Sequence, residues 1–255
     1  MTVLDTFRLD GRVALVTGGN RGIGQAIAIA LAQAGADVAL LGRTEPAETI
    51  TVVEKLGRRA LVVAADLATA GPAELATAVA TAVAGLGRLD VLVNNAGVIR
   101  RSAAVTHPAE DWDAVLRVDL DAVFHLSQAA GRVMLDQRHG KIVNVASMLS
   151  YQGGVRVPSY TAAKHGVVGL TRALANEWAA DGVNVNAIAP GYITTDNTAP
   201  LRADADRERA IRERIPAGRW GTPQDLTGAV VFLASDAARY VHGAVLAVDG
   251  GWLAR

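Results

Sequence analysis

The chain has 255 residues, with 25 basic and 25 acidic side chains, and 51% of its residues are hydrophobic. This apolar content at zero net charge excludes intrinsic disorder, and the balanced charge argues against a nucleic-acid partner. The absence of cysteine excludes disulfide frameworks, thiol catalysis and cysteine-ligated metals. No apolar stretch reaches the roughly 20 residues that a membrane span needs, and no secretory signal is visible, so we expect a cytoplasmic protein without a membrane partner.

Short apolar runs rich in β-branched residues alternate with longer segments of helical character. The runs predict seven strands, at 13–16, 38–41, 60–64, 91–93, 142–145, 183–188 and 245–248. The intervening segments predict helices at 22–34, 45–56, 72–86, 112–137, 159–180 and 223–234. Continuous apolar strands separated by helices are typical of a parallel sheet that is buried on both faces. We therefore predict an α/β fold with one domain over residues 1–255, a Rossmann-type, doubly wound, seven-stranded parallel sheet with helices on both faces.

One segment departs from this alternation. Residues 196–215 are dense in charge and predict a helical insertion before the last crossover, near the substrate site. A solvated surface helix with charge pairs is one interpretation, and a mobile lid over a ligand is the other.

A glycine-rich turn follows the first predicted strand and opens the first helix. Its glycines are Gly18, Gly22 and Gly24, a spacing that differs from the general G-x-G-x-x-G fingerprint. At such a turn, backbone N–H groups and the helix dipole face a pyrophosphate, and glycine lets the backbone approach it closely. Asp66 and Asn94 follow the third and fourth strands, where ligands bind in open α/β sheets. We therefore predict a dinucleotide site at this edge of the sheet.

The end of the second strand bears on which dinucleotide is bound. An acidic residue there would bind the adenosine ribose, whereas an arginine would pair with a 2′-phosphate. The sequence has Gly42 where the acid is expected, and Arg43 follows it. We therefore expect NAD(P) as cofactor, with NADP favoured. NAD stays open, because Arg43 can be a surface charge while Glu45 binds the ribose.

The candidate catalytic residues are Ser147, Tyr160 and Lys164. Tyr160 and Lys164 are four residues apart on a predicted helix and share one face, while Ser147 ends the fifth strand at the same sheet edge. A neighbouring ammonium favours the phenolate form of tyrosine, whose ordinary pKa is about 10. Tyr160 can then exchange a proton with an alcohol or carbonyl whose oxygen Ser147 holds.

These residues, together with Asn94–Gly97 and Pro190-Gly191, resemble the short-chain dehydrogenase/reductase family over nearly the whole chain. The resemblance implies an NAD(P)-dependent oxidoreductase and a homotetramer built through 112–137, 159–180 and the C-terminal segment. The implied cofactor-binding residues are Thr17, Gly18, Asn20, Arg21, Gly22, Ile23, Gly24, Arg43, Asp66, Leu67, Asn94, Ala96, Gly97, Tyr160, Lys164, Pro190, Gly191, Ile193 and Thr195.

Asp119 stands where members of this family usually have an asparagine that orders a helical kink and a proton-relay water. Its main-chain carbonyl can serve the same purpose, but an ionised carboxylate cannot donate a hydrogen bond. We include Asp119 among the candidate catalytic residues and expect its relay to differ.

Several strings narrow the resemblance further. They are similar to strings of dehydrogenases that act on 2-deoxy-D-gluconate or 2-dehydro-3-deoxy-D-gluconate, and less to those of gluconate 5-dehydrogenases; they occupy 98–101, 146–150, 152–160, 214–221 and 248–255. Sugar acids are the implied substrates. A carboxylate with several hydroxyls requires a guanidinium and neutral hydrogen-bond partners. The candidate substrate residues are Arg101, Ser147, Met148, Gln152, Arg156 and Tyr160.

Other possibilities follow from the remaining residues. Trp220 and Trp252 can stack on a sugar ring, or they can cap the core. The histidines show no metal-ligand spacing, so we predict no metal site. Another small polyol or ketone substrate is an alternative within the family. A nucleotide-sensing protein without catalysis is the alternative outside it, and Asp119 alone favours that one.

Overall fold

The computed structural model describes residues 2–255. Seven strands form one sheet in the order β3-β2-β1-β4-β5-β6-β7, and all neighbouring strands are parallel. This confirms the predicted doubly wound fold. The strands are β1 (Val13–Thr17), β2 (Asp37–Gly42), β3 (Ala60–Ala64), β4 (Val91–Asn94), β5 (Gly140–Val145), β6 (Val183–Pro190) and β7 (Val245–Val248).

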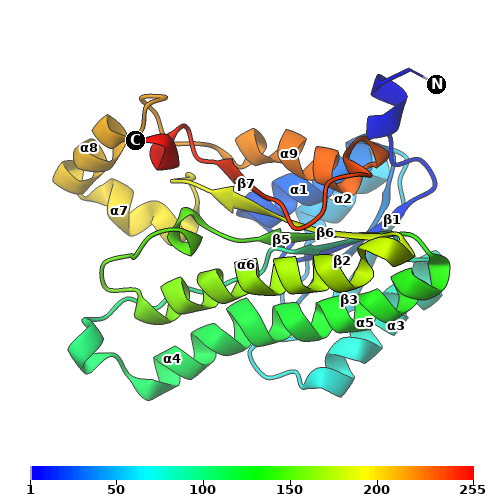
Figure 1. Ribbon diagram of the computed structural model, residues 1–255, viewed down its shortest axis with the longest axis horizontal. Helices are drawn as coiled ribbons and strands as arrows, with labels where there is room; N and C mark the ends of the chain where they lie inside the picture. Colours follow the sequence, from blue (N-terminus) through cyan, green and yellow to red (C-terminus); the bar gives the residue numbers. More distant parts are fainter. Residues whose placement is uncertain (1) are drawn as a thin grey trace.

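Helices cover both faces of the sheet (Figure 1). The α-helices are α1 (Gly22–Gln33), α2 (Ala47–Lys55), α3 (Pro72–Leu86), α4 (Ala109–Leu116), α5 (Ala122–Gln137), α6 (Pro158–Trp178), α7 (Ala199–Ala203), α8 (Ala205–Arg214) and α9 (Thr227–Ala234). Helices α1, α2 and α9 lie on one face, and α3, α5 and α6 lie on the other. Among the helices of residues 2–255, none has the length and apolar character needed to cross a bilayer.

The central strands are apolar on both sides, because successive side chains point to opposite faces. In β1, Val13 and Leu15 belong to the apolar layer that includes residues of α3 and α5. Ala14 and Val16 belong to the layer on the other face, which includes residues of α1 and α9. Burial on both faces explains why β1 reads as a continuous apolar run rather than an alternating one.

The sheet changes direction of winding at β1. The chain leaves β1 through α1 toward β2, whereas β4, the other neighbour of β1, leads to α4 and α5 on the opposite face. The two connections diverge and leave a crevice at the carboxyl ends of these strands, the usual ligand site of open α/β sheets.

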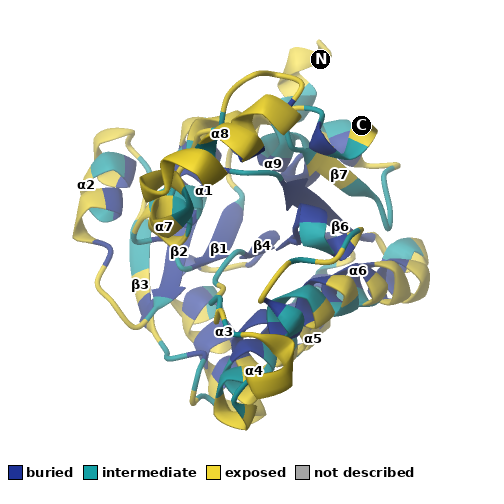
Figure 2. Ribbon diagram, turned by 90° about the vertical axis from the view of Figure 1, so that its left-hand side faces the viewer, coloured by how far each residue is buried: buried dark blue, intermediate teal, exposed yellow. Residues whose placement is uncertain are grey.

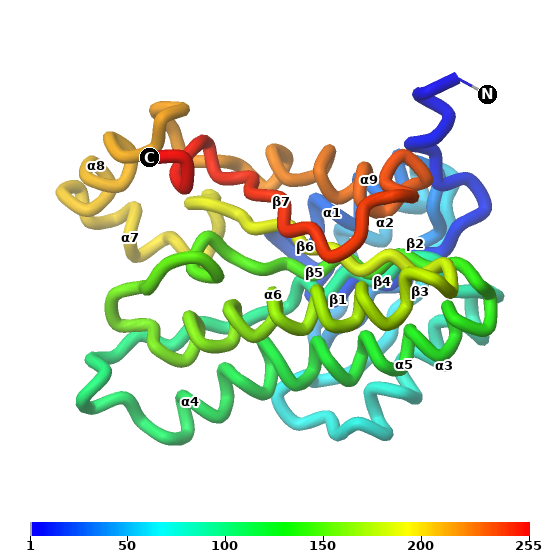
Figure 3. The backbone as a smooth tube through the Cα atoms, viewed as in Figure 1, coloured from blue at the N-terminus to red at the C-terminus, as the bar shows by residue number. Residues whose placement is uncertain are grey.

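The charged segment forms a substructure at one end of the molecule. We call residues 196–214 the cap; it comprises the 3-10 turn η6 (Asp196–Thr198), α7 and α8. Figure 2 views the molecule from this end, with the exposed cap in front of the buried strands. The C-terminal turn η9 (Trp252–Ala254) lies beside α8 (Figure 3). Ile211 and Trp252 pack together with Met148 and Ile215 in a small apolar cluster.

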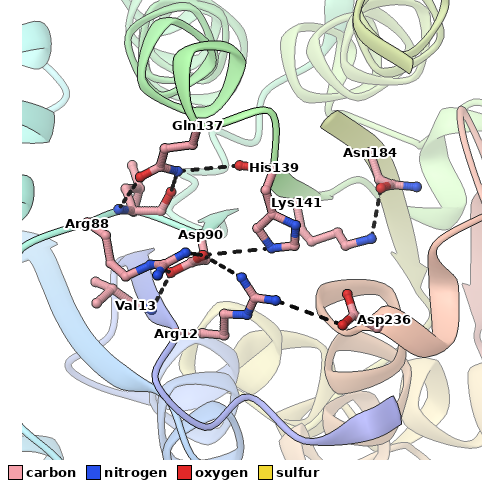
Figure 4. A network of polar contacts seen from close by, with 10 residues as sticks. Arg12, Val13, Arg88, Asp90, Gln137, His139, Lys141, Asn184 and Asp236 are labelled. Carbon is pink, nitrogen blue, oxygen red and sulfur yellow. Dashed lines mark hydrogen bonds and ion pairs between the residues drawn. The ribbon is translucent and has the colours of Figure 1, made fainter. Parts of the chain in front are cut away.

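A network of charges lies at the opposite edge of the sheet, where the strands begin (Figure 4). Asp90 is fully buried, and its carboxylate accepts a hydrogen bond from the Val13 N–H at 2.9 Å. The same carboxylate pairs with Arg12 at 3.1 Å and Arg88 at 2.7 Å, and His139 approaches it at 3.7 Å. Asp90 thus links the beginnings of β1, β4 and β5.

We predict that replacing Asp90 with alanine (D90A) lowers the free energy of unfolding by about 3 kcal/mol, because the Val13 N–H, Arg12 and Arg88 all lose their charged acceptor and hydrogen bonds to charged groups contribute about 1.5–3 kcal/mol each. Urea denaturation followed by circular dichroism measures the change. The control is D236A, which removes a half-exposed carboxylate 3.8 Å from Arg12 and should cost less than about 1 kcal/mol. Equal losses in the two variants would contradict a central role for Asp90.

Candidate active site

The glycine turn between β1 and α1 is built from bare backbone. Gly18 and Gly22 have φ angles of +67° and +57°, a left-handed conformation that favours glycine. A Cβ atom on Gly24 would lie 2.2 Å from the Gly18 carbonyl oxygen, so a side chain cannot be accommodated there. The turn therefore presents its backbone and the amino end of α1 to the crevice, an arrangement that binds anionic groups.

Hydrogen bonds tie this turn to the end of β4. The Thr17 hydroxyl accepts the N–H groups of Asn95 and Ala96, both at 2.9 Å. The Asn95 side chain donates to the Thr17 carbonyl at 2.9 Å. The preceding Asn94 is buried and donates to Asn144 at 2.9 Å. Asn94 and Thr17 therefore support the site through hydrogen bonds on its buried side.

Ser147, Tyr160 and Lys164 meet beside this crevice, as their spacing predicted. Ser147 follows β5, and α6 carries Tyr160 and Lys164 on one face. The Lys164 Nζ atom lies 5.5 Å from the centre of the Tyr160 ring and donates to the Val145 carbonyl at 2.9 Å. Lys164 is only 3% exposed, so its charge requires a buried partner.

Asp119 is that partner. It lies in η3 (Arg117–Asp121), a π-helical turn that interrupts the predicted helix 112–137 between α4 and α5. Its carboxylate is fully buried, accepts the Val98 N–H at 2.7 Å and lies 3.4 Å from the Lys164 Nζ atom. Burial raises the pKa of Asp119, against the effect of Lys164. For Lys164, burial favours the neutral form and is the largest single cause, but the charges of Asp119 and Tyr160 and the hydrogen bond to Asp119 together outweigh it, and the pKa of the ammonium is raised.

The pKa of Tyr160 is raised above its ordinary value. Burial is the largest cause, Lys164 acts in the opposite direction, and Asp119 adds to the increase. Lysine therefore favours the phenolate as expected, but burial outweighs it. Tyr160 is held protonated at neutral pH, ready to donate a proton.

A cavity of about 710 Å³ joins the glycine turn, the Tyr160 region and the cap. Its size falls within the range of about 300–1,000 Å³ for ligand pockets. The predicted site residues that line it are Gly18, Asn20, Arg21, Gly22, Ile23, Gly24, Ala96, Gly97, Arg101, Asp119, Ser147, Met148, Gln152, Tyr160, Lys164, Pro190, Gly191, Ile193 and Thr195.

Six predicted residues do not line the cavity: Thr17 and Asn94, described above, and four more. Arg43 and Asp66 lie 3.8 Å apart near the ends of β2 and β3, outside the cavity. Leu67 is buried in the core. Arg156 is exposed, and its φ of +63° places it in the left-handed region.

Several lining residues were not predicted as site residues. Among them are Ile99, Tyr192, Asn197, Leu201, Arg207 and Arg214. One signal could have found the cap residues. Arg207, Ile211 and Arg214 follow the i, i+4, i+7 spacing of a single helix face, with an apolar residue between two cations.

Known proteins match the chain along almost its entire length. A family model described as Enoyl-(Acyl carrier protein) reductase matches residues 18–253. A 2-dehydro-3-deoxy-D-gluconate 5-dehydrogenase from Dickeya dadantii (strain 3937) is 55% identical over 255 residues, which are 99% of this chain and 100% of that one.

Solved structures also match the chain along almost its entire length. A provisionally named 2-deoxy-D-gluconate 3-dehydrogenase from Agrobacterium tumefaciens, with bound NADP, is 55% identical with a TM-score of 0.91, and 98% of this chain and 99% of that chain are covered. A gluconate 5-dehydrogenase from Burkholderia cenocepacia J2315, in complex with NADP and tartrate, is 40% identical with a TM-score of 0.95 and full coverage of both chains. The resemblance inferred from the motifs is confirmed. The chain belongs to the short-chain dehydrogenase/reductase family of NAD(P)-dependent oxidoreductases.

Proposed function

We propose that the protein transfers a hydride between NADP and a secondary alcohol or ketone of a sugar acid, 2-dehydro-3-deoxy-D-gluconate or 2-deoxy-D-gluconate. The observation that carries the proposal is the placement of Ser147, Tyr160 and Lys164 in one cavity with the glycine turn. Relatives at 55% identity carry dehydrogenase names for these two acids, which supports the substrate class.

The residues at the crevice fit a dinucleotide. The bare backbone of Gly18, Gly22 and Gly24 would hold the pyrophosphate at the amino end of α1. A Cβ atom on Gly42 would meet nothing within 4 Å, so there is open space beside the exposed Arg43 for a 2′-phosphate. When bound, NADP supplies the hydride acceptor for alcohol oxidation and the hydride donor for ketone reduction.

Tyr160 and Ser147 handle the oxygen of the substrate. In the oxidative direction the alcohol loses its hydroxyl proton to the phenolate form of Tyr160 and its carbon-bound hydrogen as hydride, leaving a ketone. The Ser147 hydroxyl binds the reacting oxygen. Because its pKa is raised, Tyr160 is protonated at neutral pH, and oxidation, which needs the phenolate, should accelerate as pH rises.

Gluconate is the second candidate substrate, because the gluconate 5-dehydrogenase from Burkholderia cenocepacia is similar over its whole length. Steady-state kinetics with NADP and NAD on gluconate, 2-deoxy-D-gluconate and 2-dehydro-3-deoxy-D-gluconate separate the candidates. Turnover of an apolar secondary alcohol, but of none of these acids, would refute the proposed substrate class.

The proposed assembly is a homotetramer working in the cytoplasm. Trp112 of α4 and Phe124 of α5 each remain 37% exposed, and Tyr240 and Leu246 expose further apolar surface near β7. Exposed apolar groups along the proposed interfaces support association. A mass near 26.4 kDa by sedimentation would reject it.

We predict that Y160F abolishes most of the catalysis without disturbing cofactor binding. The variant keeps the ring but loses the hydroxyl, and general acid–base catalysis contributes about 10²–10⁴-fold to rates. We expect kcat to fall about 1,000-fold, while fluorescence titration gives an unchanged Kd for NADP. The control is Y151F, which removes an exposed hydroxyl bonded to the Val245 carbonyl. Comparable activity of Y160F and wild type would overturn the mechanism.

A second prediction concerns Asp119. The carboxylate raises the pKa of Tyr160, so its replacement by a neutral amide in D119N should lower that pKa, with the Lys164 ammonium still held by the Val145 carbonyl. The phenolate then forms at lower pH, and the acidic limb of the kcat/KM profile for alcohol oxidation should move to lower pH. D121N, a change at an exposed carboxylate two residues away, serves as the control. A shift toward higher pH, or no shift, would contradict this role.

A third prediction separates the two cofactors. R43A should raise KM for NADP about 10-fold or more, because a guanidinium pairs with phosphate through charge-assisted hydrogen bonds. KM for NAD should stay unchanged, since NAD lacks the 2′-phosphate. K55A removes another exposed cation, at the end of α2, and should affect neither constant. Equal effects of R43A on NADP and NAD would show that Arg43 does not read the phosphate.

A further inference from the structure

We propose that Arg207 of the cap, together with Arg101, binds the carboxylate of the substrate. This inference rests on the proposed function and adds to it the specificity-determining residue. Arg207 lies in α8, between β6 and α9. It is far in sequence from Ser147 and Tyr160, yet it lines the same cavity.

The geometry of α8 turns one of its faces toward the cavity. The helix is capped by Asp204, whose carboxylate accepts the N–H groups of Asp206 at 3.2 Å and Arg207 at 3.1 Å. Arg207, Ile211 and Arg214 then share one face. Ile211 is 7% exposed and packs in the apolar cluster of Met148 and Trp252, so the face that carries it points inward.

Three guanidinium groups gather around one phenol on this side of the cavity. Burial raises the pKa of Tyr192, and the charges of Arg207, Arg214 and Arg101 all act against that increase. Burial lowers the pKa of Arg101, and the like charge of Arg207 lowers it further. All four groups line the same cavity, and the repulsion between Arg101 and Arg207 favours a bound anion.

Two of the three guanidinium groups already have partners within the protein. The Arg214 guanidinium lies 3.9 Å from the centre of the Trp252 ring, a cation–π contact. Arg101 donates to the Asn197 carbonyl at 3.2 Å, which fixes its position at the edge of the cap. For Arg207, no ion pair or side-chain hydrogen bond is found within residues 2–255.

The acidic residues next to Arg207 on α8 do not neutralise it. Asp206 lies 3.8 Å from Arg209, and Glu208 lies 3.1 Å from Arg212, so both carboxylates pair with other arginines of the helix. The cavity-lining carboxylate of the cap, Asp196, is paired with Arg21, so it does not serve Arg207 as a counter-ion either. A small carboxylate supplies the missing charge, and its two oxygens match the fork of a guanidinium.

The position of Arg207 favours the substrate over the cofactor phosphates. Arg21, on the glycine turn, already forms an ion pair with Asp196 of the cap. Arg207 has no such partner and acts electrostatically on Tyr192, which lines the same cavity. The cavity also includes Gln152, a neutral partner for hydroxyl groups.

The test compares R207Q with R209Q, a matched change on another face of α8. Two substrates are used, 2-deoxy-D-gluconate and 2-deoxy-D-glucitol, which has the same carbon chain with an uncharged hydroxymethyl group. In R207Q we expect KM for the acid to rise about 10-fold or more, with a smaller change in kcat. KM or Ki for the glucitol and KM for NADP should stay within about twofold, as should all constants of R209Q. R207K should recover part of the affinity, because it restores the charge but not the fork.

Each outcome is informative. An unchanged KM for the acid in R207Q overturns the inference, and so does an equal rise for the glucitol, which would indicate that Arg207 only supports the cap. If wild-type protein turns over neither compound, the proposed function fails separately. Calorimetric titration of the acid into the NADP complex then still tests Arg207, since weaker binding to R207Q supports the inference and equal binding refutes it.

Discussion

A parallel sheet with both faces buried leaves only its two rows of strand ends for polar chemistry. In this protein the amino ends carry the Asp90 network, which joins three strands through one fully buried carboxylate. The carboxyl ends carry the glycine turn, Ser147 and the loop after β6. The arrangement separates roles: the first edge holds the strands in register, and the second provides unpaired backbone groups for a ligand.

The chemistry at the carboxyl edge depends on charges removed from water. Lys164 and Asp119 are both almost inaccessible, and each makes the other's burial tolerable. Both charges act on the pKa of Tyr160: the ammonium favours the phenolate, and the carboxylate opposes it. A family member with a neutral amide in place of Asp119 would lack that opposition. The aspartate therefore keeps Tyr160 protonated and lowers the population of its phenolate at neutral pH.

Much of the fold could be predicted, because strands that are buried on both faces appear in the sequence as short continuous apolar runs. The placement of the candidate catalytic residues was also predictable, since Tyr160 and Lys164 share a helix face and Ser147 follows a strand. The π-helical turn at Asp119 was anticipated only through the resemblance, as a helical kink, because neither proline nor glycine marks it in the sequence. Arg207 was missed for a different reason. The charged residues that form ion pairs on α8 are typical of a solvated helix. Ile211 is the one residue of α8 whose type indicates that a face of the helix is buried.

The cap has its own small apolar anchor. Four buried residues, Met148, Ile211, Ile215 and Trp252, form a cluster distinct from the layers on either side of the sheet. Substitutions on the inner face of α8 can therefore alter which molecules enter without reaching the packing that holds the strands. The residues proposed for hydride chemistry and the proposed carboxylate contact of Arg207 lie in separately packed parts of one chain, so mutation can explore new specificities at little risk to folding.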